Sequence, residues 1–169
     1  MKRVNVIISN EQKKIKIPVG LRLLIRKCCV AALRLEKIED CVTIGVLFVD
    51  NERIKAFNNK YRSKNTPTDV LSFSLNEEKG CYDRDFKTNE ILLGDIVISM
   101  EQADKQAQEY GHDFRREVAY LTVHAVLHLL GYTHKEDNIK RLRMREKEET
   151  IMTKLGLKST CNYVLEEFI

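Results

Sequence analysis

Three of the four histidines in this 169-residue chain lie within one short segment, between His124 and His134. His124 and His128 are four residues apart, and on a helix residues at that spacing stand one above the other on the same face. Gly131 follows, and a glycine just past the last turn can adopt the left-handed conformation that reverses the chain. His134 can then fold back toward the first two. The spacing therefore predicts three imidazoles around one metal ion, with one coordination position open as in catalytic zinc sites.

Two other interpretations of this segment stay open. The spacing matches the ligand pattern of the metzincin proteases, but their general-base glutamate, which directly follows the first histidine, is Ala125 here. A protease would therefore lack its usual base. The histidines could also be packing residues of a buried helix, because many of their neighbours in the sequence are apolar. Gly131 and His134 favour the metal site over this alternative.

Composition restricts the classes of protein to which the chain can belong. With 169 residues, 43% of them hydrophobic, it is long enough for a substantial core and too short to make two domains expected. No apolar run approaches the ~18 residues that span a bilayer, and no signal peptide is recognisable. Five cysteines without a CxxC pair indicate neither a disulfide framework nor a cysteine zinc site. We therefore expect a cytoplasmic protein, one domain over residues 1–169 and no membrane partner.

The chain is mildly basic, and its Lys and Arg residues are unevenly distributed along the sequence. A net charge of +4 permits a polyanionic partner without requiring one. Residues 51–64 hold five bases against one acid, although a solvent-facing helix would look similar. Arg62 precedes a predicted strand, and its planar, permanently charged guanidinium suits the bidentate binding of a phosphate.

The spacing of apolar residues predicts alternating strands and helices. Strands are expected at 4–8, 43–49, 70–75 and 92–100, and 76–90 is expected to be an exposed loop or hairpin arm. Helices are expected from Pro18 to Leu35, from the N-cap Asp50 to Tyr61, from the N-cap Asp113 through the histidines, and over about 137–155. Strand and helix alternate early and helices cluster late, which favours an α/β (α+β) fold with a small mixed sheet covered by helices.

Two of these helices have a predicted buried stripe. In the helix that carries the histidines the stripe is Val118, Leu121, Ala125 and Leu129. In the last helix it is Leu142, Ile151, Met152 and Leu155, with Arg141, Arg143, Glu146 and Glu149 on a solvated, ion-paired face.

Three ordered motifs resemble the YbeY family of endoribonucleases, also called rRNA maturation factors. They are Tyr61-Arg62 followed by residues 66–73 (TPTDVLSF), residues 93–99 (LGDIVIS) and the histidine segment. The resemblance extends from about Val42 to Met152. It implies a mixed four-stranded sheet, distantly like zinc proteases in fold. It also implies a single-strand-specific, metal-dependent endoribonuclease that acts in 16S rRNA 3′-end maturation and ribosome quality control.

The resemblance also implies a site. Carried over position by position, His124, His128 and His134 match the family's zinc ligands, and Arg62 matches its functionally important arginine. One Zn²⁺ per chain is expected, although three imidazoles also accept other divalent ions. The expected partners are single-stranded RNA and the small ribosomal subunit, with no DNA.

Other residues qualify this assignment. The family usually has glycine at the position of Ala125 and aspartate at that of Thr133, so a carboxylate next to the metal is missing here. Asp69 and Asp95 are expected to be turn or cap residues rather than catalytic ones. Two alternative functions remain: a metzincin-like metalloprotease, and a non-catalytic ribosome assembly factor that zinc stabilises.

Overall fold

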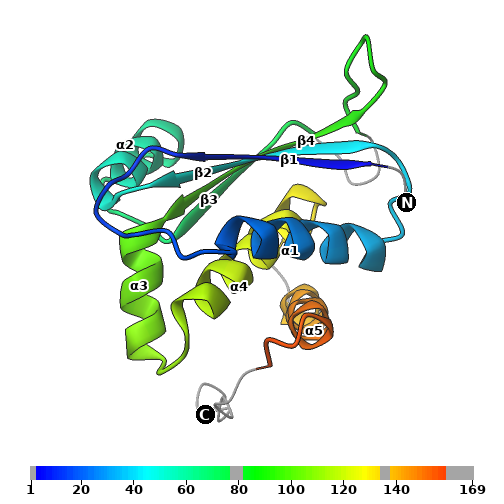
Figure 1. Ribbon diagram of the computed structural model, residues 1–169. Helices are drawn as coiled ribbons and strands as arrows, with labels where there is room; N and C mark the ends of the chain where they lie inside the picture. The colour runs from blue at the N-terminus through cyan, green and yellow to red at the C-terminus, as the bar shows by residue number, and fades with distance from the viewer. Residues whose placement is uncertain (1–2, 77–81, 134–137, 159–169) are drawn as a thin grey trace.

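The computed structural model describes residues 3–76, 82–133 and 138–158. Within them the chain forms a sheet with most of its helices on one face (Figure 1). The elements in chain order are β1 (Val4–Asn10), α1 (Leu21–Leu35), β2 (Val42–Val49), α2 (Asn51–Arg62), β3 (Val70–Ser74), β4 (Ile91–Ser99), α3 (Met100–Glu109), α4 (Phe114–Leu129) and α5 (Asn138–Lys154). No helix of this described part is both long and apolar enough to cross a membrane.

The sheet is mixed and has the strand order β1-β2-β4-β3. β1, β2 and β4 are parallel, and β3 pairs with β4 in the antiparallel direction at the edge. This arrangement confirms the predicted α/β fold with a small mixed four-stranded sheet.

The sheet buries apolar side chains on both of its faces. On one face, Ile44, Val46 and Phe48 of β2 join the main core, to which α1 and α4 contribute most of the helical residues. On the other face a smaller cluster joins Ile54 of α2 to three strand residues, Val49, Leu71 and Val97. Because successive strand residues point to opposite faces, a strand covered on both sides reads as a continuous apolar run. The segment 43–49 has that character.

The histidine helix α4 lies at the centre of the helical layer. It begins after Asp113, whose side chain accepts a hydrogen bond from the Arg115 amide, as the predicted N-cap should. All four residues of its predicted stripe are buried: Val118, Leu121, Ala125 and Leu129. α4 is packed against α1, α3 and α5 as well as β3 and β4, so its backbone is a rigid support.

Helix α3 was not expected from the sequence. The predicted strand at 92–100 ends at Ser99, whose hydroxyl accepts a hydrogen bond from the Gln102 amide and caps a new helix. This helix buries Met100, Ala103 and Ala107 at helical spacing. Two of these three are alanines, so their apolar signal is too weak to stand out among polar neighbours.

Two further expectations were wrong in detail. Pro18 lies ahead of α1 rather than in its first turn, because Gly20 has a φ of +84° and bends the chain before Leu21. In α5, Leu142 is 51% exposed and Met144 is buried instead, whereas Ile151 and Met152 of the predicted stripe are buried as expected. The hairpin arm is confirmed over residues 82–90, which project beyond the sheet (Figure 1); residues 77–81 lie outside the described residues.

A buried polar cluster joins the start of α4 to α3. The side chains of His112 and Glu117 are 5% and 4% exposed, and His112 Nε2 lies 2.9 Å from Glu117 Oε2. Gln106 Nε2 donates to Asp69 Oδ2 at 3.0 Å. Burial raises the pKa of Glu117 to about 7, with Asp69 adding to the rise and Arg116 opposing it. Burial also lowers the pKa of His112, so both groups favour their neutral forms.

The raised pKa of Glu117 predicts a loss of stability as pH rises. The folded protein holds this proton up to about pH 7, whereas the unfolded chain releases it near its ordinary value of 4.5. Folding therefore binds a proton in that range, and the free energy of unfolding falls as pH increases through it. Glu117→Gln should reduce the fall between pH 5 and pH 8 by on the order of 2 kcal/mol.

Urea denaturation at both pH values measures this difference. Glu109→Gln, which changes an exposed carboxylate of α3, is the matched control and should behave like the parent. A Glu117→Gln protein that loses as much stability as the parent between the two pH values would show that this carboxyl does not titrate there.

Candidate metal centre

Helix α4 brings two imidazoles together at one point. His124 and His128 are one turn apart, and their Nε2 atoms are 3.0 Å from each other. The two rings are nearly perpendicular, with centroids 4.5 Å apart and an interplanar angle of 81°. The two nitrogens therefore face a common point beside the helix, as the i, i+4 spacing predicted.

The other ring nitrogen of each histidine has an acceptor. His124 Nδ1 lies 2.6 Å from Oε1 of Glu148, and His128 Nδ1 lies 2.7 Å from the carbonyl oxygen of Tyr132. A carboxylate and a carbonyl accept hydrogen bonds, so we assign the proton of each neutral ring to Nδ1. Both Nε2 atoms then present lone pairs.

Two lone pairs at this distance repel one another unless a proton or a cation lies between them. Neutral imidazoles with Nδ1 held by an acceptor are the form in which histidine binds zinc and other transition metals, and such outer contacts orient the ligand. The donor set therefore fits a divalent metal ion at the Nε2 atoms. His134, the third predicted ligand, lies outside the described residues, and within those residues no group of three potential ligands occurs.

The end of α4 supplies the acceptor for His128. Gly131 has a φ of +89°, the left-handed conformation that the sequence predicted for it. The chain reverses there, with Gly131 N donating to His128 O at 2.9 Å and Tyr132 N donating to Leu127 O at 3.0 Å. This reversal brings the Tyr132 carbonyl within hydrogen-bonding distance of His128 Nδ1.

Glu148 is a residue of this site that sequence reasoning missed. It comes from α5, and its side chain is only 6% exposed. Its second oxygen, Oε2, accepts a hydrogen bond from Tyr120 Oη at 3.2 Å, so the carboxylate is held by two residues of α4. The available signal was its spacing, because it lies four residues after the buried Met144 and three before the buried Ile151.

Tyr132 is itself held by a charged pair. Its hydroxyl donates to Oε2 of Glu36 at 2.7 Å, and Lys147 Nζ donates to Oε1 of the same carboxylate at 2.6 Å. The turn after α4 is thereby tied to the end of α1 and to α5.

Arg62 belongs to α2, whereas the two histidines belong to α4. It is the last residue of α2 and is exposed, and its side chain makes no hydrogen bond or ion pair with another described residue. Nothing in the described contacts links it to His124 or His128, so its part in the site stays a prediction. Asp69 lies directly before β3, where its Oδ1 accepts from the Val70 amide at 2.7 Å. The expectation of a turn or cap was wrong for Asp95, which lies inside β4.

Comparison with known proteins identifies the family. The family model described as endoribonuclease YbeY matches residues 7–156. The chain belongs to the YbeY endoribonuclease family. An endoribonuclease YbeY from Caldanaerobacter subterraneus subsp. tengcongensis is 48% identical over 159 residues, which cover 92% of this chain and 99% of that protein. The one from Clostridium kluyveri is 41% identical, with 90% and 99% covered.

The fold comparison agrees with the family. The solution structure of TM1509 from Thermotoga maritima has a TM-score of 0.60 and 25% sequence identity, and the match covers 89% of this chain and 88% of that one. Membership of the YbeY family confirms the resemblance and the endoribonuclease predicted from it. These comparisons do not support the metzincin-like protease or the non-catalytic assembly factor.

The fold also explains why the YbeY motifs occur together. Residues 66–73 lead into β3 and residues 93–99 lie in β4, and these strands pair so that Phe73 is opposite Asp95. At Gly94 a side chain would collide with the backbone oxygen of Phe73 and press on Leu129 of α4. The three motifs are therefore in contact, with the two strands packed beneath the histidine helix.

The contact between Glu148 and His124 predicts an effect on metal affinity. Glu148→Gln keeps the size of the side chain but removes the charge that supports the imidazole, and partners of this kind typically contribute ten- to a hundredfold in affinity. We expect zinc to bind at least about tenfold more weakly, as measured by competition with a chromophoric chelator. Glu149→Gln, on the exposed side of the same helix, should leave the affinity unchanged. Equal affinities in all three proteins would contradict this role for Glu148.

Proposed function

We propose that this chain is a zinc-dependent endoribonuclease that cuts single-stranded RNA. Its substrate would be the 3′ end of 16S rRNA, processed on or near the small ribosomal subunit in the cytoplasm. The observation that carries the proposal is the pair of Nε2 atoms 3.0 Å apart whose rings are both held through Nδ1. Family membership supports RNA as the substrate, since the matching relatives are named endoribonucleases.

Each residue has a defined part in this proposal. His124, His128 and His134 would hold the metal, and Glu148 and the Tyr132 carbonyl would orient the first two imidazoles. Bound zinc would lower the pKa of a coordinated water toward ~7 and polarise an oxygen of the scissile phosphate. Arg62 would neutralise the charge that builds on the phosphoryl oxygens in the transition state.

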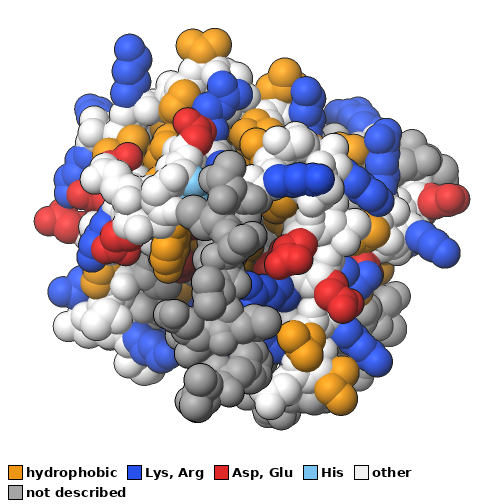
Figure 2. Space-filling view, turned by 90° about the horizontal axis from the view of Figure 1, so that it is seen from below, with side chains coloured by type: hydrophobic (Ala, Val, Ile, Leu, Met, Phe, Trp, Pro, Cys, Tyr) orange, Lys and Arg blue, Asp and Glu red, His pale blue; other side chains and the backbone are white. Residues whose placement is uncertain are grey.

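The distribution of surface charge suits an RNA substrate whose phosphates are contacted by only a few basic side chains. On the helical face of the molecule, Lys and Arg side chains are spread among acidic and apolar ones rather than joined into one basic patch (Figure 2). We therefore expect a small salt dependence of RNA binding, because few phosphates would be neutralised at once.

Two other observations support the proposal. A protease of metzincin type needs a carboxylate at position 125, and Ala125 is buried at 1% exposure. Cys28 and Cys29 are free and buried, and burial raises the pKa of the Cys28 thiol to about 12. Such thiols are unreactive and fit a reducing compartment.

The first test is metal-dependent cleavage. Zinc-loaded protein should cut unstructured RNA and largely spare perfect duplex, because a site of this kind needs a phosphodiester that can turn toward the metal. His128→Ala should lose most of its zinc and its activity together. Zinc content and mapped RNA products measure both effects. Cleavage that survives chelation, or a His128→Ala protein that holds zinc as tightly as the parent, would refute the proposed centre.

The second test separates Arg62 from the metal ligands. Arg62→Ala should keep its fold and zinc yet lose on the order of 10²–10³ in cleavage rate, the usual loss for one preorganised electrostatic donor. Arg62→Lys should recover part of the rate, because an ammonium keeps the charge but not the planar fork. Single-turnover cleavage is measured beside zinc content. Full activity in Arg62→Ala would make this arginine a surface residue, and joint loss of zinc would make it a support for the fold.

A further inference from the structure

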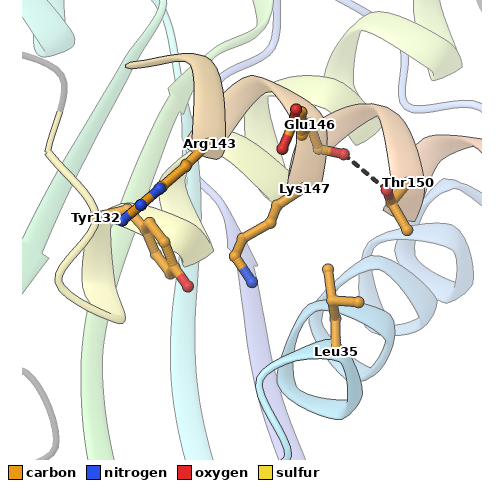
Figure 3. A pocket seen from close by; sticks show the side chains of 6 residues that line it. All are labelled: Leu35, Tyr132, Arg143, Glu146, Lys147 and Thr150. Carbon is orange, nitrogen blue, oxygen red and sulfur yellow. Dashed lines mark hydrogen bonds between the residues drawn. The ribbon is translucent and has the colours of Figure 1, made fainter. Parts of the chain in front are cut away.

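A buried carboxylate from a distant part of the chain holds the turn that follows α4. Glu36 lies at the end of α1, and its side chain is only 12% exposed. One of its oxygens accepts from Tyr132 Oη at 2.7 Å, and the other accepts from Lys147 Nζ of α5 at 2.6 Å. Tyr132 and Lys147 lie beside each other in a surface pocket that Leu35 of α1 also lines (Figure 3). One carboxylate therefore connects α1, α5 and the turn.

The position of Glu36 is not explained by α1 alone. Its amide donates to Ala32 O at 3.1 Å where the helix ends, but a carboxylate at a helix C-terminus is disfavoured by the helix dipole. Burying a carboxylate also costs free energy unless strong partners compensate. Burial opposes the charge on Lys147, but the hydrogen bonds to Glu36 and Tyr132 outweigh it and raise the pKa of the lysine. What stabilises this acid is thus its contact with the turn and with α5.

Tyr132 connects this anchor to the imidazole of His128. The amide of Tyr132 donates to Leu127 O at 3.0 Å, and its carbonyl oxygen accepts from His128 Nδ1 at 2.7 Å. With the amide held, the residue can still rotate about φ, which swings the ring and the carbonyl together. The bond from the phenol to Glu36 opposes that rotation, so the carbonyl oxygen can move only about ψ. The acceptor of His128 is therefore preorganised by a carboxylate of another helix.

We propose that Glu36 is a positioning residue of the metal centre, acting on His128 through the phenol and the carbonyl of Tyr132. The inference rests on the proposed function and deepens it, because His128 is one of the proposed zinc ligands. His124 provides an internal comparison, since its Nδ1 is held by Glu148 of α5. Loss of the anchor on Tyr132 should therefore affect His128 and spare His124.

NMR spectra of zinc-loaded protein compare the two imidazoles. The Nδ1 proton of each ring reports its own hydrogen bond, because it moves upfield and exchanges faster with water when its acceptor is less well fixed. Glu36→Ala and Tyr132→Phe should both have this effect on His128 and leave His124 unchanged. No change in His128 would overturn the inference. Equal changes in both rings would also overturn it, because they would indicate a general loosening of the helical layer.

Zinc affinity, measured by competition with a chromophoric chelator, is the second readout. Glu36→Ala and Tyr132→Phe should each weaken zinc binding about fivefold, less than the loss of about ten- to a hundredfold that is typical when a direct partner is removed. Because both act through one contact, the double variant should bind zinc within about twofold of the weaker single variant. Glu36→Gln should recover most of the affinity, because an amide oxygen still accepts from the hydroxyl. Tyr132→Phe leaves the contact between Glu36 and Lys147 in place, so its effect does not pass through α5.

Glu39→Ala is the matched control. Glu39 is an exposed acid that also follows α1, and its removal should leave the zinc affinity and both imidazole protons as in the parent. Losses that multiply in the double variant of Glu36 and Tyr132 would overturn the path through the phenol. A parent protein that binds no zinc, or that binds zinc but cuts no RNA, would instead overturn the proposed function itself.

Discussion

Two hydrogen bonds that the Nδ1 atoms of His124 and His128 donate fix the orientation of the imidazoles on α4. Glu148 and the Tyr132 carbonyl hold the imidazoles of α4 from behind, and the Nε2 lone pairs are thereby turned toward one another at 3.0 Å. This arrangement is unfavourable without a positive charge between the nitrogens. The local structure thus favours a bound cation, and the elements around α4 serve to bring the two acceptors into place.

The surrounding fold makes that arrangement rigid. One side of α4 is fully packed: ten of its residues are buried, and β3 and β4 lie beneath it. The other edge carries His124 and His128, which are half-buried. A helix fixed along its apolar side cannot rotate to relieve the repulsion between the two nitrogens. Core packing and site geometry are therefore coupled in this protein.

Sequence reasoning succeeded where a strong periodic signal was present. Strands of β-branched residues and the stripe of α4 were predicted to within about two residues, the usual uncertainty of element ends. It failed at α3, where alanines carry the buried face, and at Leu142, which lies on the exposed side of α5. In α5 charged residues dominate, so the rotation of the helix is set by what it packs against. Glu148 looked like its exposed neighbours Glu146 and Glu149 for the same reason.

The sequence by itself determined the local geometry of the proposed metal centre. The spacing of His124 and His128 places them on one helix face, and Gly131 permits the left-handed turn that ends the helix. The motifs were also enough to predict the YbeY family. Only the tertiary structure decided which groups hold the imidazoles, because Glu148 belongs to another helix and the Tyr132 carbonyl is oriented by the chain reversal. Such contacts depend on how helices pack across the core, and no pattern of residue types along one segment encodes that packing.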